Sequence, residues 1–480
     1  MKFNIVVGNP PFQDNINKKK TQHKIWPSFT EKVFSDWLQE GGFLGWITPQ
    51  SWGSPSNKIL ELLKAKDVKY MNMDTSEYFP DVASTFSHYV VRNCAPVSTS
   101  NKTDFVVGGN KFSLPFNSKT QYVPSDLSKM SMNIHGKVMF SGSETYDVEY
   151  DYVTCHNVIR HAAKKINERI LAQSEALSKL DSDADVSKVC EKLSTLAKKR
   201  LSVDISVSKE KTDKHTHPIL HTNSQVWYSS VKQSFAGKKK VMWSRSGYTK
   251  PFFDNGELGC TDMGYYILVN SKSEGKRLES YLNSKLMRYI FKTAKWSGFG
   301  NEKVFCSIPK IDLAKPQSDK DIFDVFDISK EEQSYIDSVL NPQRGKSKSN
   351  GRKSETKSEH RVKRFGEVYT PPELIKNILD NIPQSMWSDK DSTVIDPACG
   401  SGNFLIEVLE RKCDSGISPE SALENVYGVD ILQDNIDQTK DRMLERAVSL
   451  GANHDKALEL LNKNIVCSDS LSCNVGELFS

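Results

Sequence analysis

The feature that most limits the possible folds of this chain is an alternation of short apolar runs with amphipathic segments at both ends. Near the start, FNIVV, FLGWIT, VKYMNM and HYVV surround two stretches with apolar residues at helical spacing, 25–38 and 56–66. Near the end, TVID, NVYGVDI and NIVCSD alternate with helical patterns at 372–380, 403–412 and 433–449. Such alternation predicts an α/β fold with a mostly parallel sheet.

A basic, polar segment at 341–364 separates the last α/β block from the rest of the chain. It holds nine Lys and Arg, two Glu and a single aliphatic residue, so it cannot bury enough surface to fold alone. A chain of 480 residues is also too long for one ordinary core. We therefore expect a first α/β block at 1–150, a helical insertion at 151–215, a strand-rich region at 216–340, the flexible linker at 341–364 and a second α/β block at 365–480.

The charge of the chain is unevenly distributed. Residues 365–480 contain nine Lys and Arg against 20 Asp and Glu, whereas residues 1–364 contain 56 basic and 40 acidic residues. A basic region of this size favours contact with a polyanion such as nucleic acid, although a solvated surface of uneven charge explains the counts equally well.

The composition disfavours several other classes of protein. No stretch approaches the roughly 18 apolar residues of a membrane span, and the first residues turn polar too soon for a secretory signal. The nine cysteines form no CxxC pair and no Cys/His array with zinc spacing, so we expect reduced thiols and no metal site. The expected location is the cytoplasm.

A turn rich in small residues follows the first predicted strand of the last block. Asp396 ends that strand, and Pro-Ala-Cys-Gly-Ser-Gly leads into a helix, with Gly400 and Gly402 free to turn tightly beside a ligand. Asp430 and Asp469 end or follow the next two strands, so three acidic side chains are expected in one crevice. They would repel a pyrophosphate but attract a sulfonium and an ammonium group. S-adenosyl-L-methionine carries both cations.

The tetrad Asn9-Pro10-Pro11-Phe12 follows the first strand of the chain. Two prolines end the strand and fix the backbone, so the Asn9 side chain and the Pro10 carbonyl are expected at the edge of the sheet. Two oxygen acceptors on the hydrogens of an exocyclic amino group draw its nitrogen toward tetrahedral geometry and make its lone pair available. The ring of Phe12 offers a face on which a base can stack.

These motifs resemble those of N6-adenine-specific DNA methyltransferases of the type II and IIG restriction-modification kind. NPPF is similar to motif IV, DPACGSGNF to motif I, FGEVYTPPELI (365–375) to motif X, GVD to motif II and SD to motif III. The resemblance implies a Rossmann-like S-adenosylmethionine-dependent methyltransferase sheet assembled from the N- and C-terminal blocks. It also implies a separate DNA target-recognition domain at 216–340.

The resemblance implies a role for each matching residue. The amino-acid end of the cofactor would lie against Thr370, Asp396, Ala398, Cys399, Gly400 and Gly402. Asp430 would bind the ribose hydroxyls, and Asp469 the adenine of the cofactor. The target amino group would be held by the catalytic tetrad Asn9, Pro10, Pro11 and Phe12, with the flipped base between Phe12 and Phe86.

The predicted target-recognition region interleaves basic and aromatic residues, a combination suited to backbone and base contacts in DNA. Taken singly, each of these side chains is better explained by packing or solvation, but as a group they favour DNA contact. They are Lys238–Lys240, Trp243, Arg245, Tyr248, Lys250, Phe252, Lys292, Lys295 and Trp296.

The order of the motifs departs from the usual one, in which motif X comes first and motif IV follows motif III. Here motif IV comes first and motifs X to III come last, which is a circularly permuted order. It predicts that strand 3–7 lies beside the strands near 393–396 and 464–469, and that Met1 lies near Ser480.

The sequence therefore predicts a site-specific DNA methyltransferase (adenine-specific) that acts on a flipped adenine in double-stranded DNA. A methyltransferase acting on RNA or a protein glutamine is one alternative, and a non-catalytic DNA-binding relative is another. No paired-acid-plus-lysine arrangement of a nuclease is evident, so a cognate endonuclease would be a separate protein. The oligomeric state is left open, and a monomer is compatible with the sequence.

Overall fold

The chain divides into two compact units in the computed structural model. Unit 1 contains Met1–Val123, Leu127–Lys129 and Gly345–Ser480, and unit 2 contains Pro124–Asp126 and Met130–Arg344. No helix among the described residues is long and apolar enough to cross a membrane. The structure describes residues 1–13, 24–55, 57–79, 85–98, 101–150, 170–175, 177, 183–202, 206–222, 225–245, 250–294, 302–305, 307–315, 318–341 and 369–479.

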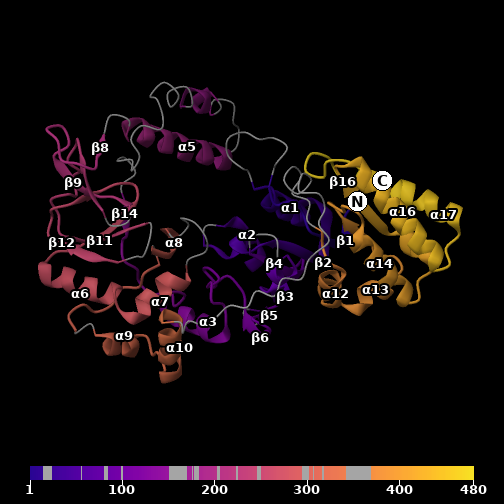
Figure 1. The fold of residues 1–480 in the computed structure, drawn as a ribbon, viewed down its shortest axis with the longest axis horizontal. Coiled ribbons are helices and arrows are strands. Elements are labelled where there is room, and N and C mark those ends of the chain that lie inside the picture. Colours follow the sequence, from indigo (N-terminus) through magenta and orange to yellow (C-terminus); the bar gives the residue numbers. More distant parts are fainter. Residues whose placement is uncertain are drawn as a thin grey trace. The chain divides into compact units, whose positions relative to one another are not determined.

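Unit 1 is built on a nine-stranded sheet (Figure 1). In spatial order its strands are β17 (Ile465–Cys467), β16 (Val426–Asp430), β15 (Val394–Asp396), β1 (Phe3–Gly8), β2 (Leu38–Pro49), β4 (Phe86–Arg92), β3 (Asp67–Asn72), β5 (Lys102–Val107) and β6 (Asn110–Pro115). Pairing is parallel from β17 through β2 and between β3 and β5, but antiparallel on both sides of β4 and between β5 and β6. Five of these eight pairings are parallel, so the mostly parallel sheet predicted from the sequence is confirmed, although the sheet is mixed. One reason is that Gly108 and Gly109, both with positive φ, close a two-residue hairpin between β5 and β6.

The two ends of the chain meet in the middle of this sheet. Ile5 of β1 pairs with Val394 of β15, and the Asn4 side chain accepts hydrogen bonds from the backbone and hydroxyl of Thr393, at 3.0 and 2.8 Å. The amino group of Met1 donates to the Gly476 carbonyl at 3.4 Å. Ser480, which is predicted to lie near Met1, is outside the described residues. The predicted joining of the first and last blocks in one sheet is confirmed. However, β17 lies at the edge of the sheet, separated from β1 by β15 and β16.

The helices of unit 1 flank this sheet. They are α1 (Trp26–Lys32), α2 (Lys58–Lys64), α12 (Pro372–Asp380), α13 (Gln384–Ser388), α14 (Asn403–Asp414), α15 (Pro419–Glu424), α16 (Gln433–Ser449) and α17 (His454–Asn464). The predicted helices at 372–380 and 433–449 are confirmed, and the one predicted at 403–412 continues to Asp414. After α1, the predicted helix at 25–38 continues as a π-helical turn, Val33–Trp37.

Helix α12 packs the last block onto strands of the first. Ile378 shares one buried core with Ile5 and Val7, and a Cβ on Gly45 of β2 would lie only 2.7 Å from its Cγ2 atom. The glycine therefore allows the helix to approach the strand closely. Truncating a buried isoleucine such as Ile378 to alanine costs about 2–5 kcal/mol.

A buried polar network joins the same helix to β4. His88 lies with Nε2 at 2.8 Å from Asn377 Oδ1 and Nδ1 at 2.8 Å from Thr75 Oγ1, and the Tyr70 hydroxyl donates to Asn377 Oδ1 at 3.2 Å. Burial lowers the pKa of His88 to about 4, so the ring is neutral at physiological pH.

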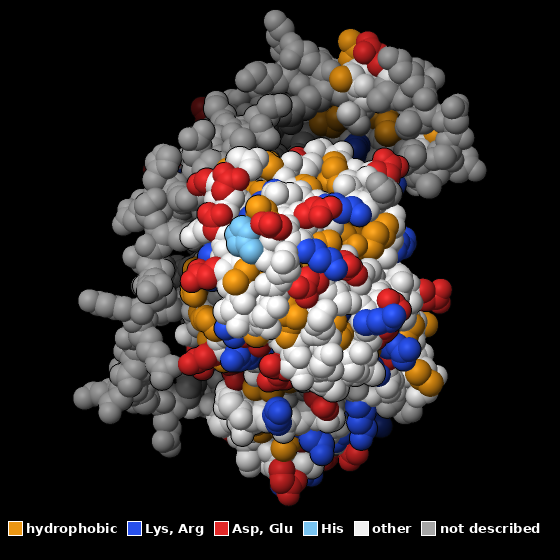
Figure 2. Space-filling model, turned by 90° about the vertical axis from the view of Figure 1, so that its right-hand side faces the viewer, with side chains coloured by type: hydrophobic (Ala, Val, Ile, Leu, Met, Phe, Trp, Pro, Cys, Tyr) orange, Lys and Arg blue, Asp and Glu red, His pale blue; other side chains and the backbone are white. Residues whose placement is uncertain are grey.

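Acidic and basic side chains are interspersed on the face of the molecule shown in Figure 2, the side on which α16 and α17 lie in Figure 1. Within the last block, Arg446 pairs with Glu410 and Arg411 with Asp380, both at 2.6 Å.

Unit 2 contains two four-stranded sheets and several helices. One sheet has the order β13 (Gly259–Cys260), β9 (His217–Leu220), β10 (Val226–Ser229) and β8 (Val207–Ser208), and the other β12 (Phe252–Asp254), β11 (Lys240–Ser244), β14 (Gly264–Leu268) and β7 (Glu149–Tyr150). The helices are α3 (Lys129–Val138), α5 (Asp183–Ser202), α6 (Lys272–Leu282), α7 (Lys285–Thr293), α8 (Glu302–Phe305), α9 (Asp319–Val325) and α10 (Lys330–Leu340).

The predicted boundary at residue 150 falls inside unit 2, because β7 pairs with β14. The region predicted as a helical insertion contains α5, as expected, but also β8, which pairs with β10. Its residues 151–169 lie outside the described part of the chain.

Candidate cofactor and acceptor site

The loop between β15 and α14 turns on two glycines with positive φ. Gly400 has a φ of 54° and Gly402 a φ of 81° at the N-cap of α14. A Cβ on Gly402 would lie 2.8 Å from the Thr439 side chain, whereas one on Gly400 would meet no described atom within 4 Å. The loop therefore packs on α16 at Gly402 and presents bare backbone to open space at Gly400, where a ligand can approach it closely.

Asp430, at the end of β16, holds this loop in place. One carboxylate oxygen accepts from the Gly400 backbone N–H at 2.9 Å, and the other accepts from Leu432 N–H at 2.9 Å and Asn435 Nδ2 at 3.1 Å. The residue predicted to bind ribose hydroxyls thus also anchors the cofactor loop.

Asp396, at the end of β15, is almost completely buried. Its Oδ1 accepts from the Ala398 N–H at 3.0 Å, and a Cβ on Gly8 would lie 2.7 Å from the same oxygen. Only a glycine lets the end of β1 approach this carboxylate so closely. Burial raises the pKa of Asp396 to about 8, and the Asp430 charge adds to this, while the Ala398 hydrogen bond opposes it.

The buried Cys399 follows in the same loop and packs near Gly428. Burial, followed by the charges of Asp396 and Asp430, raises the pKa of its thiol well above the ordinary value. The thiol is therefore protonated and unreactive, and it acts as a small packing group.

Asp469 follows β17 by two residues and is exposed. Its Oδ1 accepts from the Leu471 N–H at 3.0 Å, which closes a local turn. The next residue, Ser470, donates to the Pro397 carbonyl at 2.6 Å and so ties this turn to the cofactor loop. The three predicted acidic residues therefore follow three neighbouring strands, as expected.

The Asn9 side chain has one satisfied end and one open end. Its Nδ2 donates to Thr370 Oγ1 at 3.2 Å, whereas its Oδ1 is buried and has no hydrogen-bond partner among the described residues. Thr370, predicted to contact the cofactor, is itself buried just before α12, which has Pro371 as its N-cap and Pro372 as its first residue. The structure therefore brings Asn9 of the first block into contact with the last block.

Phe12 and Phe86 lie together, but not as two walls of a pocket. Their ring centroids are 5.0 Å apart with 25° between the ring planes, so the rings stack on each other. A base inserted between them would need the two rings to lie farther apart. The predicted pocket between the two rings is thus wrong for this structure. Phe86 is 1% exposed and also packs against Phe79, so it supports Phe12 from the core.

Two further residues near the site were not singled out from the sequence. Asn403, the first residue of α14, donates through Nδ2 to the Thr370 carbonyl at 3.3 Å. Its Oδ1 accepts from Arg442 of α16 at 2.8 Å, and Arg442 also donates to the Ser401 carbonyl. Asn403 could have been suspected from its place after Gly402 in the cofactor motif, whereas Arg442 lies in an ordinary amphipathic helix without any such signal.

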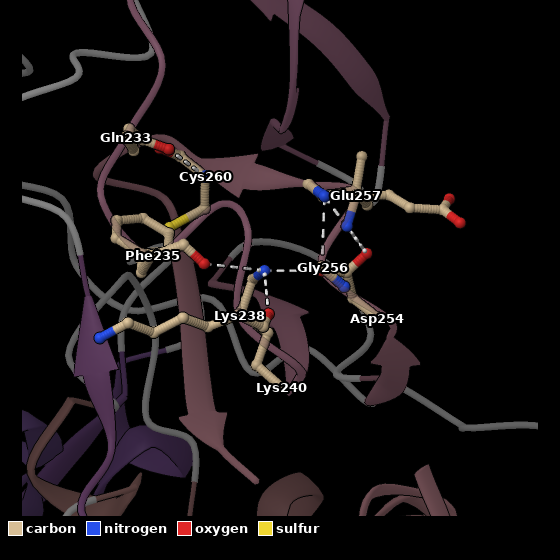
Figure 3. A network of polar contacts seen from close by, with 9 residues as sticks. Gln233, Phe235, Lys238, Lys240, Asp254, Gly256, Glu257 and Cys260 are labelled. Atoms are coloured by element: carbon tan, nitrogen blue, oxygen red, sulfur yellow. Dashed lines mark hydrogen bonds and ion pairs between the residues drawn. The ribbon is translucent and has the colours of Figure 1, made fainter. Parts of the chain in front are cut away.

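In unit 2, one predicted DNA contact is wrong: Lys240 is fully buried. Its Nζ donates to the carbonyls of Phe235 and Lys238, at 3.3 and 3.0 Å, and to Asp254 Oδ2 at 2.6 Å (Figure 3). Asp254 in turn accepts from backbone N–H groups of residues 256–258. Three donors and a charge are satisfied inside the protein, so this lysine is structural.

The other predicted DNA contacts of unit 2 differ in their exposure. Trp243 is buried and is therefore a packing residue. Lys292 donates to the Val339 carbonyl at 2.6 Å. Arg245 is half-buried and Lys250 is exposed. Three of the predicted contacts lie outside the described residues: Tyr248, Lys295 and Trp296.

Within the described residues, no group of three or more His, Cys, Asp or Glu side chains could hold a metal ion.

Two segments of the chain match protein-family models. Residues 1–80 match the Eco57I restriction-modification methylase family, and residues 355–450 match the N-6 DNA methylase family. Both ends of the chain are thus similar to DNA methylases of restriction-modification systems. These are the segments that contribute β1 with Asn9 and β15 with Asp396 to one sheet.

Two curated proteins match over shorter segments. A type II methyltransferase, M.VspI of Vibrio sp. (strain 343), is 34% identical over 91 residues, which are 19% of this chain and 20% of that protein. The methylase subunit of the type I restriction enzyme MjaVII of Methanocaldococcus jannaschii is 52% identical over 42 residues, 9% of this chain and 7% of that subunit. The matched segments thus span a fifth or less of these relatives.

Solved structures of restriction-modification enzymes align only loosely with the chain. The type IIL enzyme MmeI in complex with DNA aligns with a TM-score of 0.26 at 10% identity, over 57% of this chain and 42% of that one. The ATP-dependent type ISP enzyme LlaBIII bound to DNA aligns with a TM-score of 0.29 at 10% identity, over 70% of this chain and 29% of that one. Scores in this range do not establish a shared fold.

Proposed function

We propose that this chain is an S-adenosyl-L-methionine-dependent methyltransferase that methylates the N6 amino group of adenine in double-stranded DNA. The observation that carries the proposal is the Asn9 side chain, whose Oδ1 is buried without a hydrogen-bond partner among the described residues while its Nδ2 is held by Thr370. A buried acceptor in this state costs about 1–3 kcal/mol. A ligand with an N–H group would satisfy it.

Asn9 and Pro10 would activate the amino group of adenine. Its nitrogen is a weak nucleophile because the lone pair is delocalised into the ring. If Asn9 Oδ1 and the Pro10 carbonyl each accept one of its hydrogens, the nitrogen moves toward tetrahedral geometry and the lone pair becomes available. The nitrogen loses a proton only after the methyl group has been transferred, so no strong base is required.

The loop after β15 fits the proposed cofactor. S-adenosyl-L-methionine would supply an electrophilic methyl group on a sulfonium. Gly400 offers backbone that a ligand can approach, and the carboxylates at the ends of β15 and β16 suit cationic groups. We assign Asp396 and the loop 398–402 to the amino-acid end of the cofactor, Asp430 to the ribose and Asp469 to the adenine.

The proposed enzyme has its motifs in permuted order, with the acceptor tetrad first and the cofactor motifs last. The parallel pairing of β1 with β15 supports this order, because it places the strand that leads to Asn9 beside the strand that ends at Asp396. The basic segment 341–364 would be a tether between unit 2 and the cofactor-binding block.

Unit 2 would be the target-recognition domain and would contact duplex DNA. Residues 1–364 carry the basic excess of the chain, and Lys250 is exposed. We propose Arg245, Tyr248, Lys250, Lys295 and Trp296 as DNA contacts. A flipped adenine would stack on Phe12 from the side opposite Phe86, because Phe86 already covers the other face.

The test is methyl transfer from labelled cofactor to duplex DNA of mixed sequence, followed by digestion to nucleosides. We expect label in N6-methyladenine. The Asn9→Ala variant should lower kcat by about 100- to 1000-fold, as for other groups that stabilise a transition state. Its stability should stay within about 1 kcal/mol of the unsubstituted protein, because the deleted oxygen lacks a partner.

RNA and protein acceptors in the same assay separate the alternatives. Label in RNA or in glutamine side chains, with none in DNA, would replace the proposed substrate. Cofactor that fails to bind, together with DNA that does bind, would instead identify a non-catalytic DNA-binding protein.

A further inference from the structure

A chain of hydrogen bonds connects the cofactor loop to the acceptor tetrad. Arg442 Nη1 donates to Asn403 Oδ1 at 2.8 Å, Asn403 Nδ2 donates to the Thr370 carbonyl at 3.3 Å, and Asn9 Nδ2 donates to Thr370 Oγ1 at 3.2 Å. These four residues come from α16, α14, the turn before α12 and the end of β1, all within unit 1.

The chemistry of Arg442 fixes the direction of the two hydrogen bonds that Asn403 makes. A guanidinium can only donate and a backbone carbonyl can only accept, so Asn403 must turn its oxygen to Arg442 and its amide nitrogen to Thr370. Arg442 also donates to the carbonyl of Ser401, inside the cofactor loop. The same arginine therefore holds both the loop and the Asn403 side chain that donates to the Thr370 carbonyl.

The orientation of the Asn9 amide is the feature that this chain would control. Asn9 Oδ1 can accept from a target amino group only while Nδ2 points away from it, and Thr370 Oγ1 accepts from Nδ2 on that side. With the amide rotated by half a turn, two N–H donors would face the N–H donors of the target.

We propose that Thr370 and Asn403 are positioning residues that hold the Asn9 carboxamide with its oxygen toward the acceptor. This inference rests on the proposed function, and it differs from the cofactor contact that the motif resemblance implies for Thr370. Thr370 acts through Asn9, and Asn403 acts through Thr370. The same series of hydrogen bonds therefore connects the loop that would bind the cofactor to the residue that would activate the base.

The experiment compares Thr370→Val with Thr370→Ser in the full-length chain. Valine keeps the shape of threonine but removes the acceptor for Asn9, whereas serine keeps it. We expect Thr370→Val to lower kcat for DNA methylation by about 10- to 100-fold, the range expected for a misplaced catalytic group. KM for DNA should change less than about threefold, and Thr370→Ser should stay within about threefold of the unsubstituted enzyme in kcat.

Binding of S-adenosylhomocysteine, measured by calorimetry, separates this role from a cofactor contact. The inference expects Thr370→Val to keep the Kd within about twofold. A Kd raised tenfold or more, with a proportionate loss of activity, would overturn it in favour of direct cofactor binding. If Thr370→Val proves unstable in denaturant, Thr370→Ala is used for the same measurements, since the smaller side chain cannot clash.

A double-mutant comparison supplies the second test. In an Asn9→Ala background the Thr370→Val change should have little further effect on single-turnover methyl transfer, because the group that it positions is gone. Full additivity of the two losses would contradict the inference. A chain that transfers no methyl group in any background would refute the proposed function itself, whereas an active enzyme whose kcat is unchanged by Thr370→Val would refute only the positioning role.

Discussion

Asn9 in unit 1 and Lys240 in unit 2 are both polar side chains held inside the protein, yet their hydrogen bonding differs. Lys240 has an acceptor for each of its three donors, namely Asp254 and two backbone carbonyls. Asn9 has a partner for its nitrogen, but its buried oxygen has none among the described residues. From the sequence, Asn9 is a candidate contact of the target base and Lys240 a candidate contact of DNA.

The difference separates a polar group that completes a fold from one that awaits a ligand. A buried charge is tolerated only while it is paired with an opposite charge. Removing one partner leaves the other charge buried without compensation. An unsatisfied buried oxygen costs about 1–3 kcal/mol, and at Asn9 the N–H group of a substrate would supply the missing donor. Completeness of hydrogen bonding, and not burial or charge, distinguishes the two sites.

The largest effect is expected from Lys240→Met, which leaves the Asp254 carboxylate buried without its cation. We expect the free energy of unfolding of the protein to fall by about 3–5 kcal/mol, measured by chemical denaturation with a probe in unit 2. Lys239→Ala, on the exposed neighbouring residue, is the matched control and should change stability by less than about 0.5 kcal/mol. Equal effects of the two substitutions would show that the buried pair is not structural.

A pH series addresses Asp396. Its pKa of about 8 in the fold lies above the ordinary value of 3.8, so between these values the native state holds one more proton than the unfolded chain. Stability conferred by this group is therefore present at low pH and is lost as the pH rises through 8. A cationic cofactor favours the ionised form, so its affinity should rise by up to about tenfold per pH unit below pH 8 and level off above it.

Asp396→Asn is the control for this series. Calorimetric titration with S-adenosyl-L-methionine between pH 6 and 9 should show the rise in affinity with the unsubstituted protein and a flatter profile with the variant. Identical slopes for both proteins would mean that another group is responsible.

The smallest effect is expected from the exposed lysines next to Lys240. Lys238→Ala and Lys239→Ala should each weaken duplex DNA binding by a few-fold at low salt, and each should reduce the slope of log K against log salt by about one if it contacts a phosphate. Binding is measured by fluorescence anisotropy at several salt concentrations. An unchanged slope in both variants would show that Lys238 and Lys239 do not contact DNA phosphates.

The sequence predicts those strands, helices and turns of unit 1 that depend on local sequence patterns. Apolar runs and helical spacing mark strands β1 to β4 and β15 to β17 and helices α1, α2, α12, α14 and α16, but not β5, β6, α13, α15 or α17. The prolines and glycines of residues 9–11 and 396–402 mark the two turns at the site. Local patterns do not reveal which groups meet in space. The contact between Asn9 and Thr370 joins residues 361 positions apart, and Arg442 carries no local sign of its hydrogen bond to Asn403.

The failures of prediction have a common physical cause. Lys240 and Trp243 belong to a basic and aromatic segment, but β11 lies between two other strands of its sheet and both side chains are buried. Phe12 and Phe86 were matched to a base pocket by residue type, whereas their packing against each other depends on the core beneath Phe86. Residue type alone does not distinguish a side chain facing a ligand from one facing a neighbour.

The pairing of β1 with β15 has a consequence during synthesis on the ribosome. β1 is made before β15, which lies nearly 390 residues later, as the Asn4–Thr393 contact illustrates. At roughly 5–20 residues per second, one edge of β1 waits about 20–80 s for its partner strand. During that interval β2 can pair with one edge of β1, while the other edge of this apolar strand stays unpaired. Yield of the native protein should therefore depend on chaperones that shield the unpaired edge while the chain is being made.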